Sequence, residues 1–245
     1  MTATIPVPAW YQGTLAGFDL ETTGPDPETA RIVTASIVVR GANHTPGDYA
    51  WLVNPGIDIP EGATAVHGIT TEKARTDGID PDRAVAEIAD TLRSLAHAGV
   101  PVVVYNAPYD FTVLDRETRR HGLPPFGDFI VAGVMTVVDP LVLDKQIDPY
   151  RRGKRTLTAT AEHYQVRLDD AHEATADALG AMRIAWRMAH LHPHIAAMGP
   201  AEFQSFQAHA KATQAASFED YLRRSGKPDQ IDGSWPYRPY SETEP

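Results

Sequence analysis

The chain has 245 residues, no cysteine and a formal net charge of −10, from 22 lysines and arginines against 32 aspartates and glutamates. Its length allows one domain of about 150–200 residues with an extension, and 42 % apolar residues are enough to bury a core. The absence of cysteine excludes disulfides, thiolate metal sites and cysteine nucleophiles. The excess of acid argues against a protein that coats duplex nucleic acid through massed phosphate contacts.

Residues 1–12 are rich in proline and contain neither the basic nor the apolar region of a signal peptide. We therefore expect an N-terminal arm and a cytoplasmic protein, which the lack of cysteine also fits. No stretch approaches the roughly 18 consecutive apolar residues that cross a bilayer, so a membrane partner is not expected.

The N-terminal part of the chain predicts three strands with short connections. Leu15–Gly24 reads as a strand that runs into a turn, and Arg31–Arg40 is apolar and β-branched between turn-forming residues. Asp48–Val53 is the third strand, closed by the Asn-Pro-Gly turn that begins at Asn54. Short connections favour an antiparallel meander.

The middle of the chain alternates helices with strands. Helices are predicted over Pro81–Ala98, with apolar residues at helical spacing, and over Tyr109–His121. Strands are predicted over Val100–Tyr105 and Phe129–Val138, where apolar and β-branched residues run together. The five strands predict an α/β domain with a mixed sheet, three strands antiparallel and two reached through crossovers.

The C-terminal part is predicted to be helical and then irregular. A short helix over Thr156–Tyr164 precedes a long one over Asp170–His190, which opens with the capping-box pattern Asp170-x-x-Glu173. Ala201–Leu222 is a further helix, followed by a tail rich in proline and aromatic residues. We expect one domain over residues 13–192 and, over 193–245, a helical extension with an arm.

Acidic residues follow two of the predicted strands. Asp19 and Glu21 alternate along the end of the first strand, so their carboxylates share one face; a cation or a solvated strand end would account for them. Asn106 and Asp110 follow the strand that ends at Tyr105. Asp110 fits either an acid in the first turn of a helix or a functional group at the end of a central strand.

The third acidic motif lies on the long predicted helix. His172 stands at or just before the helix start, and Asp177 follows one and a half turns later among alanines. A histidine alone at this place is most often a surface residue. An aspartate among Ala174, Ala176 and Ala178 is poorly placed for solvent.

Taken in chain order, these motifs resemble the DEDD superfamily of 3′–5′ exonucleases. The matching segments are FDLETTG, VHGIT, YNAPYDFTVL, KRTLTATAEHYQV and HEATADA, so the resemblance covers residues 13–192. His172 lies five residues before Asp177, which indicates the DEDDh (DnaQ-like, proofreading epsilon-like) branch, since the sister branch carries a tyrosine where Glu173 stands. The resemblance implies a ribonuclease H-like fold with a five-stranded mixed sheet.

The resemblance also implies a metal-dependent hydrolysis of phosphodiester bonds. Two Mg²⁺ or Mn²⁺ ions would be held by oxygen ligands, with Asp19 bridging them and Glu21 and Asp177 completing one ion's site. Asp110 would hold the second ion, partly through water. His172 would act as the general base, since imidazole titrates near neutral pH.

Further residues are candidates for binding the strand. Thr22 and Thr23 are expected to meet the terminal nucleotide, Asn106 to contact it or a ligand, and His67 to wall the base pocket together with Ile69. Arg151 and Arg152 open the densest basic run of the chain. That run is either a phosphate track for a single strand or a solvated loop.

The motifs leave several alternatives open. The leading hypothesis is a 3′–5′ exonuclease on single-stranded DNA that releases nucleoside 5′-monophosphates, with DNA repair as a context. An exoribonuclease like ribonuclease T or oligoribonuclease is the close alternative, because a contact to the 2′-hydroxyl is not readable from sequence. A non-catalytic module that docks to a polymerase or repair complex is the third, and a homodimer is also open.

Overall fold

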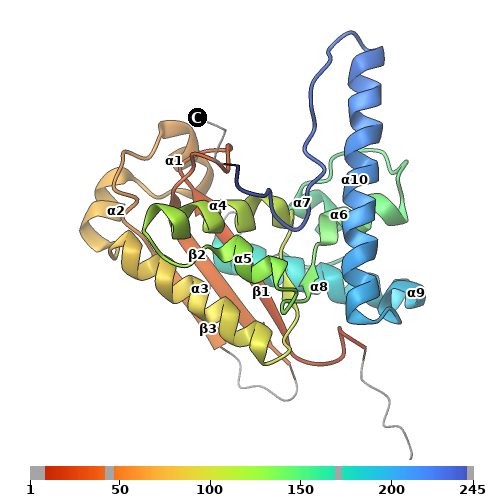
Figure 1. The fold of residues 1–245 in the computed structure, drawn as a ribbon, viewed down its shortest axis with the longest axis horizontal. Coiled ribbons are helices and arrows are strands. Elements are labelled where there is room, and N and C mark those ends of the chain that lie inside the picture. The colour runs from red at the N-terminus through yellow and green to blue at the C-terminus, as the bar shows by residue number, and fades with distance from the viewer. Residues whose placement is uncertain (1–8, 42–46, 169–172, 242–245) are drawn as a thin grey trace, which may run out of the picture.

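The computed structural model describes residues 9–41, 47–168 and 173–241. Its centre is one five-stranded sheet in the order β3-β2-β1-β4-β5 (Figure 1). The strands are β1 (Leu15–Thr22), β2 (Ile32–Arg40), β3 (Gly47–Leu52), β4 (Val102–Val103) and β5 (Val137–Val138). The first three pair antiparallel, and β4 and β5 extend the sheet parallel to β1. The predicted α/β class with a mixed five-stranded sheet is confirmed.

Ten helices are assigned among the described residues. They are α1 (Glu61–His67), α2 (Thr71–Asp77), α3 (Pro81–His97), α4 (Ala107–Arg120), α5 (Phe126–Val131), α6 (Pro140–Ile147), α7 (Leu157–His163), α8 (Ala174–Leu191), α9 (Pro193–Ala196) and α10 (Pro200–Arg224). Within the described ranges, none of them is both long enough and apolar enough to cross a bilayer.

The sheet lies between two groups of helices, and each face of it has its own core. On one face, Phe18 stacks on Phe111 of α4, and the apolar side of α3 packs beside them. On the other face, α8 lies across β1 and β2, with Ile184 and Met188 fully buried. Figure 1 shows α3 and α4 on the near side of the strands and α8 on the far side.

Gly17 lets α8 approach the sheet closely. A Cβ atom at Gly17 would lie only 2.4 Å from the backbone oxygen of Ala178 and 2.8 Å from the side chain of Met182. A side chain there would push α8 away from β1. The glycine thus sets the distance between the strand that ends in Asp19 and Glu21 and the helix that begins near Asp177.

Two predicted elements differ from the structure. The strand expected over Phe129–Val138 is only β5 at its end, because the helix α5 takes up its first residues. Phe126 is buried and Phe129 and Ile130 pack on the same core, so the apolar residues follow helical spacing. The long helix begins at Ala174, with Glu173 as an N-cap that makes no side-chain bond; the expected start at Asp170 lies outside the described residues.

The C-terminal extension is a long helix and a returning tail. The helix predicted over 201–222 is α10, and the tail after it runs back across α4 and α5 (Figure 1). Trp235 and Tyr237 pack against the core cluster that includes Phe126. The tail aromatics therefore fasten the arm to its own domain.

Candidate metal centre

Three carboxylates meet where β1 ends and α8 begins. Asp19 and Glu21 are two residues apart on β1 and therefore share a face of the strand. Asp177 comes from the first turn of α8, which packs on that strand. One oxygen from each of the three carboxylates lies within 4.8 Å of the other two. These are the residues to which the resemblance assigns the first ion.

Asp110 approaches the same cluster from α4. It lies in the first turn of that helix with 4 % of its surface exposed, and its Oδ1 accepts the backbone N–H of Leu20 at 3.1 Å. This hydrogen bond ties α4 to β1 between Asp19 and Glu21. The charge of Asp110 is also the largest contribution of a neighbouring group to the pKa of Asp19.

The electrostatics of the cluster favour a cation. Burial, followed by the charges of Asp110, Asp177 and Glu21, raises the pKa of Asp19 well above its usual range. Burial and the charge of Asp177 raise the pKa of Glu21 to about 7. Burial also raises the pKa of Asp110. Carboxylates held this close repel one another unless protons or cations neutralise them.

The donor set fits hard divalent ions. All four side chains offer carboxylate oxygen, the ligand that Mg²⁺ and Mn²⁺ prefer. Among the ion pairs of the described residues, none involves Asp19, Glu21 or Asp110. No basic side chain in that part of the chain therefore neutralises these three acids, and divalent cations would.

The turn after β1 is held by a tyrosine that the sequence analysis did not select. The hydroxyl of Tyr109 contacts Thr22 Oγ1 and donates to the carbonyl of Gly24 at 2.5 Å. The Thr23 hydroxyl accepts the backbone N–H of Arg31 at 3.0 Å. Thr22 and Thr23 are both buried, so their side chains shape the turn beside the cluster.

A pocket of about 420 Å³ opens directly beside Glu21. Its lining comes from the three antiparallel strands, α1, α2 and the start of α8: Glu21, Thr34, Ala35, Ala50, Trp51, Leu52, His67, Ile69, Lys73, Glu173, Ala174 and Thr175. His67 Nδ1 accepts the N–H of Ile69 at 3.1 Å, which leaves Nε2 as the protonated nitrogen of the neutral ring. Burial lowers the pKa of His67, and its Nε2 is buried without a hydrogen-bond partner.

Asn106 forms the turn that leads into α4. Its backbone is left-handed, with φ at 68°, and its N–H donates to Asp139 Oδ1 at 3.1 Å. Asp139 is a residue that the sequence analysis missed. The Asp139-Pro140 pair is a typical helix start, with a capping acid before a proline in the first turn, and this pattern was the available signal.

The basic run after α6 is divided between structure and surface. Arg151 and Arg155 bind the fully buried carboxylate of Asp144, at 2.7 and 2.5 Å. Arg151 therefore forms an internal ion pair. Arg152 is exposed, so it is the residue of this pair that we still expect to contact the nucleic acid strand. Arg116 of α4 is likewise engaged inside the protein, since it is buried and pairs with Glu28. His172 lies outside the described residues.

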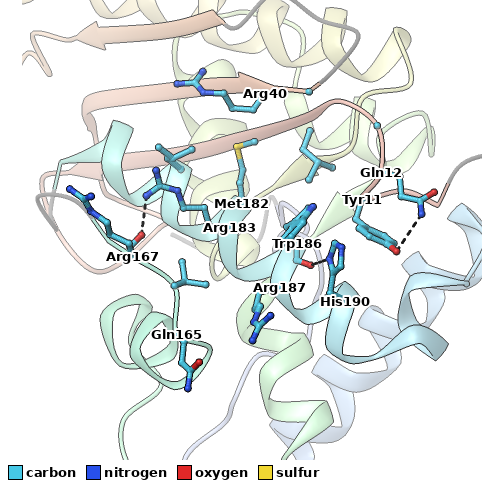
Figure 2. A pocket seen from close by; sticks show the side chains of 15 residues that line it. Tyr11, Gln12, Arg40, Gln165, Arg167, Met182, Arg183, Trp186, Arg187 and His190 are labelled. Carbon is cyan, nitrogen blue, oxygen red and sulfur yellow. Dashed lines mark hydrogen bonds between the residues drawn. The ribbon is translucent and has the colours of Figure 1, made fainter.

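A hollow larger than the pocket beside Glu21 lies elsewhere. A groove of about 780 Å³ runs along the outer flank of α8, lined among others by Tyr11, Met182, Arg183, Trp186 and His190 (Figure 2). None of the four acids lines it. The Arg183 side chain donates to the backbone oxygen of Arg167 across one end of this groove.

Comparisons with known proteins agree with this geometry. A family model described as exonuclease (RNase_T) matches residues 16–185. A DNA polymerase III subunit epsilon-like protein from Rhodobacter capsulatus is 36 % identical over 107 residues, which are 42 % of this chain and 14 % of that protein. The chain thus spans only a small part of this curated relative.

Solved structures of E. coli exonuclease I share the fold. The complex with a dT13 oligonucleotide has a TM-score of 0.63 and 18 % identity, covering 81 % of this chain and 45 % of that one. The zinc-bound complex with single-stranded DNA has a TM-score of 0.60 and 20 % identity, covering 74 % and 41 %. This likeness confirms the ribonuclease H-like fold. The chain belongs to the exonuclease family, as a member of the DEDDh type.

Proposed function

We propose that this protein is a metal-dependent 3′–5′ exonuclease that hydrolyses the terminal phosphodiester bond of a nucleic acid strand and releases nucleoside 5′-monophosphates. The observation that carries the proposal is the meeting of Asp19, Glu21 and Asp177, with oxygens within 4.8 Å, beside Asp110. Among the described ion pairs none involves Asp19, Glu21 or Asp110, and buried acids gathered in this way serve a structural purpose poorly. They serve two divalent ions well.

The four acids would bind the metal ions, and His172 would accept a proton. Asp19, Glu21 and Asp177 would hold one ion and Asp110, with Asp19, a second. When bound, the two ions would offset the charge on the attacking and leaving oxygens of the phosphate. His172 would take the proton of the attacking water, as the resemblance to the family implies; in the sequence it precedes Asp177 by five residues.

The pocket beside Glu21 supports attack at a chain end. It is large enough for a nucleoside and is walled by His67, Ile69 and Trp51. Thr22 and Thr23 form the turn between this pocket and the acids, and we assign the terminal nucleotide to this place. Asn106 is the N-cap of α4, the helix that carries Asp110 in its first turn, and we assign it a contact with the nucleotide or with a ligand. Arg152 would meet a phosphate farther along the strand.

Single-stranded DNA is the substrate we favour. The solved relatives that share the fold are described with dT13 or other single-stranded DNA, and the curated relative is named for a polymerase subunit. That name also supports a proposed association with a polymerase. RNA as a substrate is the alternative. A purely docking role is disfavoured, because a scaffold has no use for the carboxylate cluster.

The test is the digestion of 5′-labelled DNA and RNA oligomers with Mg²⁺, Mn²⁺ or EDTA. We expect a ladder that shortens from the 3′ end, fastest on single-stranded DNA, and that disappears in EDTA and in the variants Asp19→Asn and Asp177→Asn. The matched control is Asp58→Asn, which removes a carboxylate that is 80 % exposed. Full activity in both cluster variants, or cleavage that persists in EDTA, would contradict the proposal.

A second measurement concerns the base. His172→Ala should lower the turnover rate by about 100-fold or more, since general bases contribute roughly 100- to 10,000-fold. Mn²⁺ binding should be unchanged, because the four acids remain. If the turnover rate of His172→Ala is unchanged, a group other than His172 must accept the proton of the attacking water.

A further inference from the structure

The first turn of α4, which carries Asp110, is held by a carboxylate from another part of the chain. Asp139 is fully buried, and its two oxygens accept the backbone N–H groups of Asn106 at 3.1 Å and Ala107 at 3.0 Å. The same side chain caps α6 through the N–H groups of Leu141 and Val142. Asp139 therefore fixes where α4 begins.

Asp139 is in turn held by the C-terminal extension. Its backbone N–H donates to Gln207 Oε1 at 2.8 Å, and Gln207 Nε2 donates to the carbonyl of Val137 at 2.9 Å. One turn earlier on α10, Gln204 accepts from the N–H of Val137 at 3.1 Å and donates to its carbonyl at 2.9 Å. The two glutamines thus bond the edge strand β5 as a further strand would. Gln207 is fully buried.

The tail after α10 contacts α4 directly. The backbone N–H of Arg238 donates to Thr112 Oγ1 at 2.8 Å, and Arg116 donates to the carbonyls of Arg238 and Pro239 at 3.1 and 3.3 Å. The extension therefore reaches the first turn of α4 through Asp139 and contacts the middle of that helix directly, where the tail returns across it (Figure 1). The family model ends at residue 185, so these contacts come from outside it.

We propose that α10 is a working part of the metal centre: Gln207 positions Asp139, and Asp139 positions α4 so that Asp110 faces the other three acids. This inference rests on the proposed function. Loss of the Gln207 amide leaves the buried N–H of Asp139 without its partner and leaves the carbonyl of Val137 with Gln204 as its side-chain donor. The loop that carries Asp139 can then shift, and Asp110 moves with the first turn of α4. Supporting residues of this kind typically change metal affinity by about 10- to 100-fold.

The test compares two methionine variants of the full-length chain. Gln207→Met keeps the side-chain length and removes both hydrogen bonds. Gln214→Met is the matched control, because Gln214 also lies on α10 and its Nε2 donates to the carbonyl of Val142 at 3.0 Å, away from the oxygens of Asp139. We measure Mn²⁺ binding by titration calorimetry and electron paramagnetic resonance, and amide hydrogen exchange over residues 107–112.

Gln207→Met should weaken the binding of one of two Mn²⁺ ions by about 10-fold, speed exchange at the start of α4, and lower kcat with little change in KM. Excess Mn²⁺ should restore most of the rate. Gln214→Met should bind Mn²⁺ as the wild type does. Equal Mn²⁺ binding in both variants and the wild type would overturn the proposal.

Two safeguards keep the result interpretable. If Gln207→Met does not fold, as judged by circular dichroism, Asp139→Asn replaces it and should also weaken Mn²⁺ binding, because an amide cannot accept from both N–H groups; unchanged binding there would refute the idea equally. Mn²⁺ binding is measured without substrate. A wild type that binds Mn²⁺ but cleaves nothing would contradict the proposed function. The Mn²⁺ affinities of the variants would still test whether Gln207 and Asp139 position the metal ligands.

Discussion

The carboxylate cluster should reduce the stability of the metal-free protein at neutral pH, and Glu21 is the residue at which to measure this. Its pKa rises from 4.5 to about 7 on folding, because of burial and the charge of Asp177. An acid whose pKa is raised in the folded state binds its proton more tightly there than in the unfolded chain. The cost is absent below about pH 4.5, grows as pH rises, and is complete above about pH 7.

The size of the effect follows from the two pKa values. Their difference corresponds to about 3.4 kcal/mol at most, since a tenfold change in affinity is about 1.4 kcal/mol. Glu21 is partly exposed, and solvent screening reduces this to about 1–2 kcal/mol. The variant Glu21→Gln removes the charge and keeps the size. It should be more stable than the wild type by that amount at about pH 8, and should melt roughly 3–6 °C higher.

The assay is urea unfolding in EDTA at about pH 5 and about pH 8, followed by tryptophan fluorescence. Asp58→Asn, at an exposed site, should show no comparable gain. Mg²⁺ should reverse the order of the two proteins, because the wild type binds it only when folded. The reasoning is refuted if Glu21→Gln is less stable than the wild type at the higher pH, or if the difference is the same at both pH values.

The remaining predictions concern packing and charge. Gly17→Ala should lower stability by about 2–4 kcal/mol and activity with it, because the new Cβ meets the oxygen of Ala178 at 2.4 Å; an unchanged melting temperature would contradict this. Arg151→Ala should cost about 2–3 kcal/mol, since Asp144 then keeps a single partner. Arg152→Ala should leave stability unchanged and raise KM in a salt-dependent way, as steady-state kinetics at several salt concentrations will show.

Much of the architecture was readable from local patterns. The three N-terminal strands, α3, α4 and α10 lie close to the predicted ranges, because their apolar periodicity or β-branched composition is strong. The strand expected over Phe129–Val138 was wrong in its first part, because the four apolar residues in a row at 129–132 fit a strand and a buried helix equally well. The short helices α1, α2 and α6 offered too few residues for a period to be visible.

The charged residues show where local patterns stop. Arg151 reads as a strand-binding or solvated charge, yet it pairs with the buried Asp144 seven residues earlier. Arg116 is buried against Glu28, which lies 88 residues away along the chain. An ion pair depends on which elements the fold brings together, and a single segment contains no record of its partner. Asp139 is a similar case. Its N-cap pattern was visible in the sequence, but the hydrogen bonds that it accepts from Asn106 and Ala107 were not.

The types of group available for chemistry were visible in the sequence, because the acids, their order along the chain and the absence of cysteine point to oxygen ligands and an imidazole. Which of these groups lie close enough to act together depends on the packing of the folded chain. The close contact at Gly17 brings Asp177 to Asp19 and Glu21, and the bond to Leu20 brings Asp110 beside them. The reason is physical, because an acid is a metal ligand only at distances of a few ångströms, and long-range packing sets those distances.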